Sequence, residues 1–404
     1  MMPRERILRQ IRPFLDQLPI KVLLGPRRCG KTTLLGQLQE ELKRRGVPDE
    51  RLISVHFDDP ASAPLCRPGA LYHHLAERIV QNEGKSYIFL DEVGRASGWE
   101  RCIDSLNIRY NCDLYLASSS ANLLDSDPSI RLGERCVVFR VGPLSLSEFG
   151  QRYTAHFPET DERAVFEAYM KLGGLPYLER LGYDEELCAQ YLRDAFSAIE
   201  LADIVRPYQV RDVALLERLL AHVNLSEKNG FSATALSRTL KSETAAASTE
   251  TMLNYLDACV NAHLLCRVPR EDVPTHKLLT VREKYYLMDH GLRDAVYGAQ
   301  SRATERLLEH AVLAEMLQRG YEVRTGRVGT QEIDFIGDRG DERVYVQVAD
   351  TMPSRKATRQ KFEVFDDVRD NYPKYVVSLD RVDMSRNGIK HRHVRAFLTQ
   401  EAWN

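Results

Sequence analysis

The sequence lacks the features that mark secreted, membrane and zinc-binding proteins. Its eight cysteines form no C-x-x-C pair and have no histidines at zinc-ligand spacing, which argues against structural zinc and favours a reducing compartment. No run of about 18 apolar residues occurs, and the basic segment 1–12 lacks the apolar centre of a signal peptide. We therefore expect a soluble, cytoplasmic protein without a membrane partner.

A large excess of charge of one sign is also absent. The net charge is -2, with 28% charged residues, so a uniformly basic surface is excluded and any contact with nucleic acid must come from a local patch. The 404 residues are enough for two or three domains with sizeable cores.

One motif near the N-terminus carries specific chemistry. It has the form G-x-x-x-x-G-K-[ST], follows the apolar run 20–24 and opens a helical pattern, and with the next residue it reads Gly25-Pro26-Arg27-Arg28-Cys29-Gly30-Lys31-Thr32-Thr33. The glycines permit backbone angles that turn successive N–H groups inward at the positive end of the following helix. Lys31 can then reach the β and γ phosphates of a nucleotide, while the Thr32 hydroxyl binds Mg²⁺. We predict that residues 25–33 bind a nucleotide.

Short apolar strands and helical segments alternate from residue 20 to about residue 145, a pattern typical of a parallel sheet flanked by helices. The expected strands are 21–24, 52–58, 86–90, 113–117 and 136–141. After residue 150 the pattern becomes helical and is broken by the turn Gly173-Gly174-Leu175-Pro176. We assign residues 1–150 to an α/β core and residues 151–205 to a helical lid.

Two carboxylates follow a buried strand of this core. The apolar run 87–90 leads directly into Asp91 and Glu92, which places both carboxylates at the carboxyl end of the sheet, beside the loop. Asp91 is predicted to bind Mg²⁺ through its water shell. Glu92 is predicted to act as the general base on the attacking water.

Two further candidates lie next to neighbouring strands. Ser119 follows the strand 113–117 and is the best candidate to hydrogen-bond the attacking water and sense the γ-phosphate, although serines at a strand end are also ordinary turn formers. Arg135 precedes the strand 136–141. It either reaches the γ-phosphate of a neighbouring subunit as an arginine finger or is an ordinary exposed arginine.

Together these segments resemble the AAA+ ATPases, and more narrowly a prokaryotic family that joins an AAA+ core to a C-terminal domain of unknown function. The segments that carry the resemblance are 25–35, Leu90-Asp91-Glu92-Val93 with Trp99, Ser118-Ser119-Ser120 and Pro143-Leu144-Ser145-Leu146-Ser147-Glu148-Phe149. The resemblance implies ATP and Mg²⁺ as cofactors. ATP is expected rather than GTP on this ground, and no guanine-reading N-K-x-D motif lies near the core. Because an arginine finger that acts in trans requires a neighbour, Arg135 also motivates the expectation of a homo-oligomer, which can be a ring.

Two details of the resemblance concern single positions. In this family a Gly-Arg pair usually fills the positions of Glu134 and Arg135. The turn 173–176 resembles the Gly-x-Pro lid motif of related ATPases, which implies that Pro176 packs near the adenine. A helix-breaking turn is the alternative, and both interpretations can hold at once.

Residues 206–298 are predicted to form a winged helix. Helices are expected at 213–223, 234–240 and 249–262, followed by strands at 264–268 and 284–288. The candidate recognition helix contains two acidic residues and no Lys or Arg between residues 249 and 257, whereas base readout uses Arg, Lys, Asn or Gln. A structural or coupling role is therefore favoured over sequence-specific DNA reading. Arg238 and Lys241 leave contacts with DNA phosphates open.

Residues 299–404 are predicted to be a separate α/β domain, with a helix at 304–319 and strands near 322–325, 332–336, 343–348 and 375–379. The order of Glu309, Asp334 and the strand around Gln347 resembles the PD-(D/E)XK nucleases, the restriction-endonuclease-like fold. In that fold a helix glutamate, a strand aspartate and an E-x-K motif hold Mg²⁺ and activate water. Here Gln347 and Ala349 stand at the E-x-K positions. The missing carboxylate and lysine predict a nuclease-like fold without nuclease activity.

Basic residues gather in two segments of this tail, Arg355-Lys356 with Arg359 and Lys361, and Lys390 with Arg392 and Arg395. Such clusters either contact nucleic-acid phosphates without reading sequence or form a solvated surface. The chain as a whole is thus predicted to be an AAA+-type ATPase that couples hydrolysis to conformational change, with DNA as a candidate partner. The alternative is a nucleotide-gated switch or partner-binding protein with slow turnover.

Overall fold

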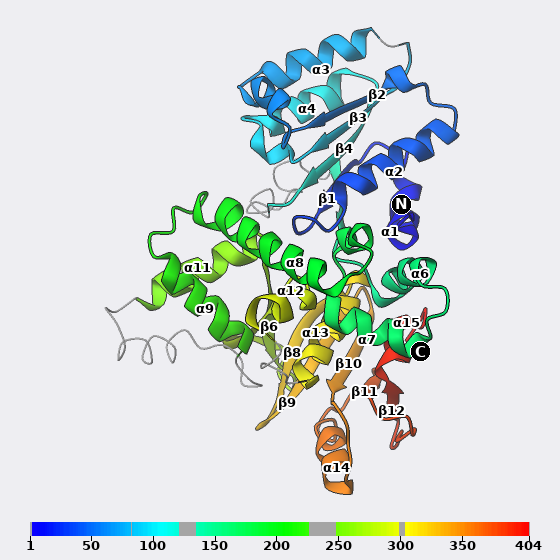
Figure 1. The fold of residues 1–404 in the computed structure, drawn as a ribbon, viewed down its shortest axis with the longest axis vertical. Coiled ribbons are helices and arrows are strands. Elements are labelled where there is room, and N and C mark those ends of the chain that lie inside the picture. The colour runs from blue at the N-terminus through cyan, green and yellow to red at the C-terminus, as the bar shows by residue number, and fades with distance from the viewer. Residues whose placement is uncertain (1, 82, 121–134, 226–247, 299–303, 404) are drawn as a thin grey trace. The chain divides into compact units, whose positions relative to one another are not determined.

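The apolar runs of the first 150 residues form a sheet of five parallel strands in the computed structural model (Figure 1). The strands are β1 (Ile20–Leu24), β2 (Leu52–His56), β3 (Ser86–Asp91), β4 (Cys112–Ser118) and β5 (Cys136–Arg140). Their order across the sheet is β2-β3-β4-β1-β5. The predicted α/β fold with a parallel central sheet is confirmed, and each strand ends within about two residues of its expected bounds.

The structure describes residues 2–81, 83–120, 135–225, 248–298 and 304–403. The chain divides into two compact units, Met1–Gly142 with Asn261–His263, and Pro143–Val260 with Leu264–Asn404. Each unit contains its own sheet. The finer domain boundaries expected from the sequence stay predictions.

Helices cover both faces of the five-stranded sheet. They are α1 (Glu5–Ile11), α2 (Lys31–Arg44), α3 (Ala70–Val80) and α4 (Trp99–Arg109). The first two pack on one face and the last two on the other, each pair closing its own apolar core. α2 buries Leu34, Leu38 and Leu42 at helical spacing, and all of β1 is buried, as expected for a strand covered on both sides.

A buried ion pair links β1 to β4 near their amino ends. The Lys21 ammonium contacts Asp113, and the two side chains are 0% and 1% exposed. The Asp113 carboxylate also accepts hydrogen bonds from the Tyr115 hydroxyl at 2.8 Å and the Asp16 N–H at 3.0 Å. Lys21 donates to the Gln17 carbonyl oxygen at 2.8 Å. These bonds compensate two charges that have no access to water.

Replacing Asp113 with Ala is expected to lower the free energy of unfolding by about 3–5 kcal/mol, because the Lys21 ammonium stays buried without its counter-charge. Urea denaturation followed by circular dichroism measures this loss. Asp49→Ala is the control: Asp49 pairs with Lys43 and is 76% exposed, and exposed pairs contribute about 0–1 kcal/mol. Equal stability of the two variants would contradict the role given to the buried pair.

The second unit contains helices from its start to the end of the chain. They are α6 (Leu146–His156), α7 (Glu162–Leu172), α8 (Glu185–Ile199), α9 (Val213–Leu225), α11 (Thr249–Asn261), α12 (His290–Tyr297), α13 (Thr304–Gln318), α14 (Arg355–Glu363) and α15 (Val394–Thr399). The helices expected at 213–223, 249–262 and 304–319 are confirmed by α9, α11 and α13. The expected helix 234–240, with Arg238 and Lys241, lies outside the described residues.

The Gly173-Gly174 turn is a close crossing of two backbone segments. The Asp289 carboxylate at the start of α12 accepts hydrogen bonds from the N–H groups of Gly174 at 2.7 Å and Gly291 at 2.9 Å. Gly173 has a φ of 78°, and a Cβ there would lie 2.0 Å from a carboxylate oxygen of Asp289. Pro176 is buried and begins a short 3-10 helix. The glycines are therefore required by packing within this unit.

The strands of the second unit form one sheet in the order β12-β11-β10-β9-β8-β6-β7. They are β6 (Leu265–Asp272), β7 (Lys277–Leu287), β8 (Glu322–Val328), β9 (Gln331–Arg339), β10 (Glu342–Val348), β11 (Lys374–Ser378) and β12 (Ile389–His393). The β6–β7 hairpin, expected as the wing, pairs with β8 through residues 270–272 and 325–327. Hairpin and tail thus share a continuous sheet (Figure 1).

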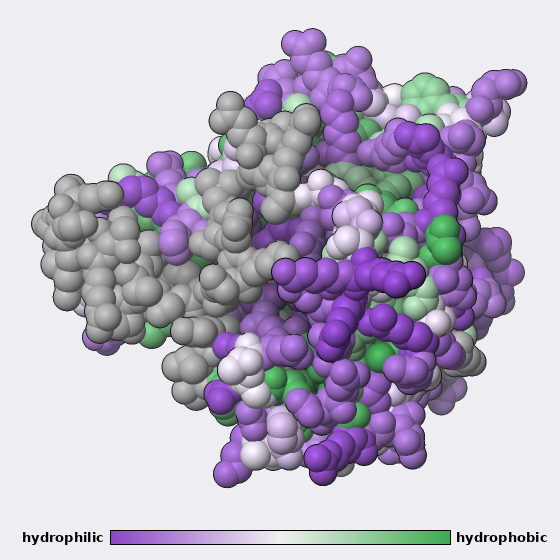
Figure 2. Space-filling view, turned by 90° about the horizontal axis from the view of Figure 1, so that it is seen from below, coloured by the Kyte–Doolittle hydropathy of each residue, from purple (hydrophilic) through white to green (hydrophobic). Residues whose placement is uncertain are grey.

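Hydrophilic residues predominate on the surface shown in Figure 2, which is seen from below Figure 1. In α14, Arg355, Lys356 and Arg359 are exposed, although Arg359 pairs with Glu363, whereas Lys361 is only 20% exposed and contacts Glu305. Three of the four residues of the first basic cluster therefore lie on the surface.

The second basic cluster is engaged within its own unit. Arg392 donates to the His391 carbonyl oxygen at 2.9 Å, and Arg395 lies 4.0 Å from Glu162. Lys390 lies over the ring of Tyr375. No helix in the described ranges has the length and apolar character needed to cross a membrane.

Candidate functional site

The glycine-rich loop joins β1 to α2, as its sequence predicts. Gly30 caps α2 with a φ of 95°, a conformation that favours glycine. At Gly25 a Cβ would lie 1.9 Å from the Val141 carbonyl oxygen, so no side chain fits there. The Cys29 thiol donates to the same oxygen at 3.0 Å. The loop is thus held against the segment that follows β5, with the amino end of α2 open to an anion.

The Lys31 ammonium lies inside this loop. It donates to the carbonyl oxygens of Gly25 at 2.9 Å and Pro26 at 2.8 Å, and it is 3.9 Å from Glu92 Oε1. The side chain is 4% exposed. A nucleotide phosphate must therefore compete with two backbone carbonyl oxygens for this ammonium. The ammonium can move to the phosphate by rotation about the bonds of the Lys31 side chain.

Thr32 and Asp91, the two residues expected to hold a metal ion, are in contact. The Thr32 hydroxyl donates to Asp91 Oδ2 at 2.6 Å. Asp91 Oδ1 is buried and has no hydrogen-bond partner among the described residues, which is costly for a carboxylate oxygen. A hydroxyl and a carboxylate are oxygen ligands of the kind that Mg²⁺ prefers. The residues present therefore fit a Mg²⁺ ion.

Glu92 has an unusual backbone and a defined set of partners. Its φ of 55° is rare for a residue with a Cβ. Its Oε2 accepts hydrogen bonds from the Ser119 N–H at 3.0 Å and the Ser119 hydroxyl at 2.8 Å. Ser119, expected to contact the attacking water, is thus placed on the expected base. Glu92 is fixed by the end of β4 and faces the Lys31 ammonium.

Replacing Ser119 with Ala is expected to lower kcat for nucleotide hydrolysis about tenfold, because one of the two hydrogen bonds that orient Glu92 is lost. KM should change little, since in the described part of the chain the hydrogen bonds of Ser119 go to Glu92 and not to the loop. Ser119→Thr keeps a hydroxyl and should recover activity. Ser118→Ala is the matched control, because the Ser118 hydroxyl donates to the Ser120 carbonyl oxygen at 3.3 Å. An unchanged kcat in Ser119→Ala would contradict the positioning role.

Arg135 lies just before β5, at some distance in the sequence from the loop. Its guanidinium is 3.7 Å from Asp104 of α4, and its side chain is 50% exposed. Glu134 lies outside the described residues. Its exposed side chain can contact a neighbouring subunit. The arginine-finger role of Arg135 stays a prediction.

Two site residues escaped the sequence analysis: His56 is the last residue of β2, and Asp58 follows that strand. His56 Nδ1 lies 3.5 Å from Asp91 Oδ2. Asp58 accepts a hydrogen bond from Arg27 of the loop at 3.2 Å and pairs with Arg95 at 2.6 Å. The available signal was the rule that polar residues at the carboxyl ends of neighbouring parallel strands meet at one edge of the sheet.

Pro176 belongs to the second unit. Its packing near the adenine stays a prediction.

A family of known proteins matches the segment that contains the candidate site. Residues 17–150 match a family described as an AAA domain, and this range contains the loop, both carboxylates, Ser119 and Arg135. Residues 163–303 match a domain of unknown function. The chain is 30% identical to an uncharacterized protein of Haemophilus influenzae over 406 residues, which cover 99% of each chain.

Several solved structures also match, at low similarity. A mutant of Thermotoga maritima RuvB is 15% identical, with 67% of this chain and 91% of that one covered and a TM-score of 0.35. The Aeropyrum pernix ORC1 protein in complex with DNA is 13% identical, with 75% and 94% covered and a TM-score of 0.32. AMPPCP-bound DnaA from Aquifex aeolicus is 17% identical, with 65% and 87% covered and a TM-score of 0.33.

Proposed function

The chain carries an AAA-type P-loop domain and belongs to the family of the Haemophilus influenzae protein that it matches over almost its whole length, and from this we propose that it is a Mg²⁺-dependent ATPase of the AAA+ type. The observation that carries the proposal is the meeting of Thr32, Asp91 and Glu92. A metal-binding pair with an unpartnered carboxylate oxygen lies beside a glutamate that Ser119 holds in place.

Each residue has a distinct part in the proposed reaction. The N–H groups at the start of α2 bind the phosphates, and Lys31 adds a positive charge to them. Thr32 and Asp91 hold Mg²⁺, which neutralises charge on the phosphates when bound. Glu92 accepts a proton from the attacking water, and the Ser119 donors keep its carboxylate oriented. ATP rather than GTP rests on the family resemblance alone.

The proposal is tested by measuring phosphate release from ATP by the full chain with and without Mg²⁺. We expect turnover that requires Mg²⁺ and is lost in Asp91→Asn, because that change removes a charge from the metal-binding pair. Tight ATP binding without any phosphate release by the wild type would reject hydrolysis and keep only nucleotide binding.

We also propose that the active form is a homo-oligomer in which Arg135 reaches the nucleotide of the neighbouring subunit. The exposed side chain of Arg135, just before β5, supports this, because a trans-acting arginine must reach the surface of its own subunit. Light scattering after size exclusion, with ATP, Mg²⁺ and Glu92→Gln to trap the bound state, should give a multiple of the 46.3 kDa chain mass. A monomer under these conditions would reject this part.

A nucleotide-gated switch with slow turnover is the second candidate. The observation in its favour is that Lys31 is bonded to the loop's own carbonyls, so nucleotide entry must first break these contacts. Steady-state ATP turnover with and without branched or single-stranded DNA separates the two functions. Stimulation by DNA of more than a few-fold favours a motor that acts on DNA, and slow turnover insensitive to DNA favours the switch.

For the second unit we propose a coupling role in the cytoplasm rather than sequence-specific DNA reading. α11 carries acidic and apolar residues but no Lys or Arg, and the β6–β7 hairpin continues into the C-terminal sheet. We assign that sheet a nuclease-like fold without nuclease activity. Cleavage of DNA that requires Mg²⁺ and disappears in Asp334→Ala would overturn this assignment.

A further inference from the structure

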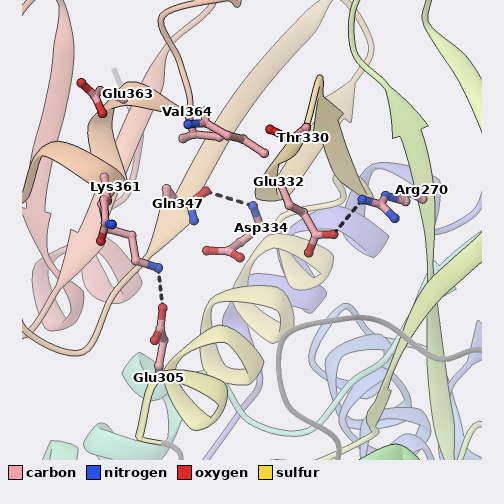
Figure 3. Close-up of a pocket in the computed structure, with 11 residues that line it drawn as sticks. Arg270, Glu305, Thr330, Glu332, Asp334, Gln347, Lys361, Glu363 and Val364 are labelled. Carbon is pink, nitrogen blue, oxygen red and sulfur yellow. Dashed lines mark hydrogen bonds and ion pairs between the residues drawn. The ribbon is translucent and has the colours of Figure 1, made fainter. Parts of the chain in front are cut away.

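A cluster of carboxylates in the second unit surrounds the side chain of Lys284. Glu332 and Asp334 come from β9, and Glu309 comes from α13. Glu309 is 2% exposed and Asp334 is 7% exposed. Of this cluster, Glu332 and Asp334 line a pocket of about 380 Å³, together with Gln347 and Lys361 (Figure 3). Buried carboxylates at this density require a counter-cation.

Lys284 supplies this cation from β7. Its ammonium is 2.7 Å from Glu332 Oε1 and 3.7 Å from Asp334 Oδ1, and its side chain is 1% exposed. Burial alone lowers the pKa of Lys284, but the nearby Tyr286 and the three carboxylates outweigh this and raise it above its ordinary value. The lysine is therefore charged over the whole physiological range of pH. Tyr286 in turn donates to Glu309 at 2.9 Å.

Other oxygen atoms in and around the cluster also have donors from the chain, and Glu332 Oε2 pairs with the Arg270 guanidinium at 3.1 Å. Asp334 Oδ2 accepts from the Val348 N–H at 2.8 Å, and Gln347 Oε1 accepts from the Asp334 N–H at 3.2 Å. The Val348 carbonyl oxygen accepts from the Lys361 ammonium at 2.5 Å, and Lys361 also contacts Glu305 (Figure 3). Backbone carbonyls and amide oxygens are ordinary ligands of hard metal ions. Here each one is occupied by a donor of the chain.

We propose that Lys284 is the permanent cation of this carboxylate centre, standing where a divalent metal ion would otherwise bind, and that Lys361 fills the adjacent position on the Val348 carbonyl. The carboxylate centre of the second unit then needs no bound metal ion, because the chain itself supplies its positive charge. With the Lys284 ammonium among them, these carboxylates are not placed to hold a metal ion, and neither is any other group of three or more His, Cys, Asp or Glu side chains in the part of the chain that the structure describes; the proposal therefore requires the carboxylates to move inward when the ammonium is removed. The proposal goes beyond the ATPase function and does not depend on it.

A tethered ammonium has a physical consequence that a bound metal does not. It cannot dissociate, so the centre keeps its charge balance when free divalent ions are scarce. It also cannot lower the pKa of a bound water or polarise a phosphate as a metal ion does. The centre can therefore hold the sheet and α13 together but lacks the group that metal-dependent phosphodiester cleavage requires.

The test is to remove the ammonium and to offer Mn²⁺ to the full chain. In EDTA, Lys284→Met should lower the melting temperature by several degrees, because the cluster loses its buried ammonium and Glu332 is left with Arg270 as its ion-pair partner. Millimolar Mn²⁺ should restore much of this loss, with about one more Mn²⁺ bound per chain than in the wild type. Electron paramagnetic resonance of free Mn²⁺ counts the bound ions. The first unit is the same in both chains, so the difference reports the second unit.

Two controls separate this result from a general loss of stability. Lys171→Met removes an exposed lysine whose partner is Glu185, with side chains 56% and 68% exposed, and should neither destabilise the chain much nor bind extra Mn²⁺. Lys284→Met with Asp334→Asn should lose the Mn²⁺ response. The proposal is overturned if folded Lys284→Met gains no Mn²⁺. It is also overturned, whether or not that variant folds, if the wild type binds a Mn²⁺ that Asp334→Asn abolishes.

Discussion

Replacing Glu92 with Gln should lower kcat for ATP hydrolysis by about 10²–10⁴-fold and leave the affinity for Mg-ATP within a few-fold of the wild type. A glutamine amide cannot accept the proton of the attacking water, but it has the shape of the glutamate. Its carbonyl oxygen can still accept the hydrogen bonds from the Ser119 N–H and hydroxyl, at 3.0 and 2.8 Å in the wild type. The strained turn at residue 92 and the contact with β4 should therefore survive. Acid-quenched measurement of ADP formation under single-turnover conditions measures the chemical step directly.

The matched control is Glu77→Gln on α3, a carboxylate that is exposed and lies outside the site. It should hydrolyse ATP at the wild-type rate. A wild-type rate in Glu92→Gln would mean that another group takes the proton, and His56, 3.5 Å from Asp91 Oδ2, would be the first residue to examine. Loss of ATP binding together with activity would instead indicate that Glu92 is needed to shape the loop.

The sequence was sufficient for the parts of this site that are local in the chain. The loop 25–32 and the strand ending in Asp91 are continuous segments, so their position and their predicted chemistry both follow from residue order. The rule that parallel strands present their carboxyl ends at one edge then brings Thr32 to Asp91, as the 2.6 Å contact shows. For the same reason all five strands of the first sheet could be located from their apolar runs.

The contacts that the sequence could not supply depend on tertiary geometry. Ser119 contacts Glu92 where the backbone of Glu92 adopts a φ of 55°. The residue types next to Glu92 in the sequence do not predict that angle. Lys284 meets Glu332 and Asp334 only because the β6–β7 hairpin joins the C-terminal sheet, a pairing of three residues between β6 and β8. β12 was missed because its sequence, Ile-Lys-His-Arg-His, is too polar to indicate a strand.

Replacing Lys31 with Met should weaken Mg-ATP binding on the order of 100-fold, since charge-assisted hydrogen bonds to phosphate oxygens are lost. Met is close to Lys in length and keeps its apolar stem, so α2 should begin as before. The carbonyl oxygens of Gly25 and Pro26 lose their donor in the same variant. The measurement is fluorescence titration with a labelled ATP analogue, which reports binding without turnover.

The control for the Lys31 variant is Lys43→Met at the other end of the same helix, where the ammonium pairs with Glu40 and Asp49 and the side chain is 38% exposed. It should bind the analogue like the wild type. The binding kinetics of Lys31→Met also bear on the choice between the motor and the nucleotide-gated switch. If Lys31 restrains the loop as well as binding phosphate, Lys31→Met should speed association with the analogue while speeding dissociation far more. Unchanged affinity in Lys31→Met would mean that the ammonium stays on the loop carbonyls when nucleotide binds, which neither the motor nor the switch allows.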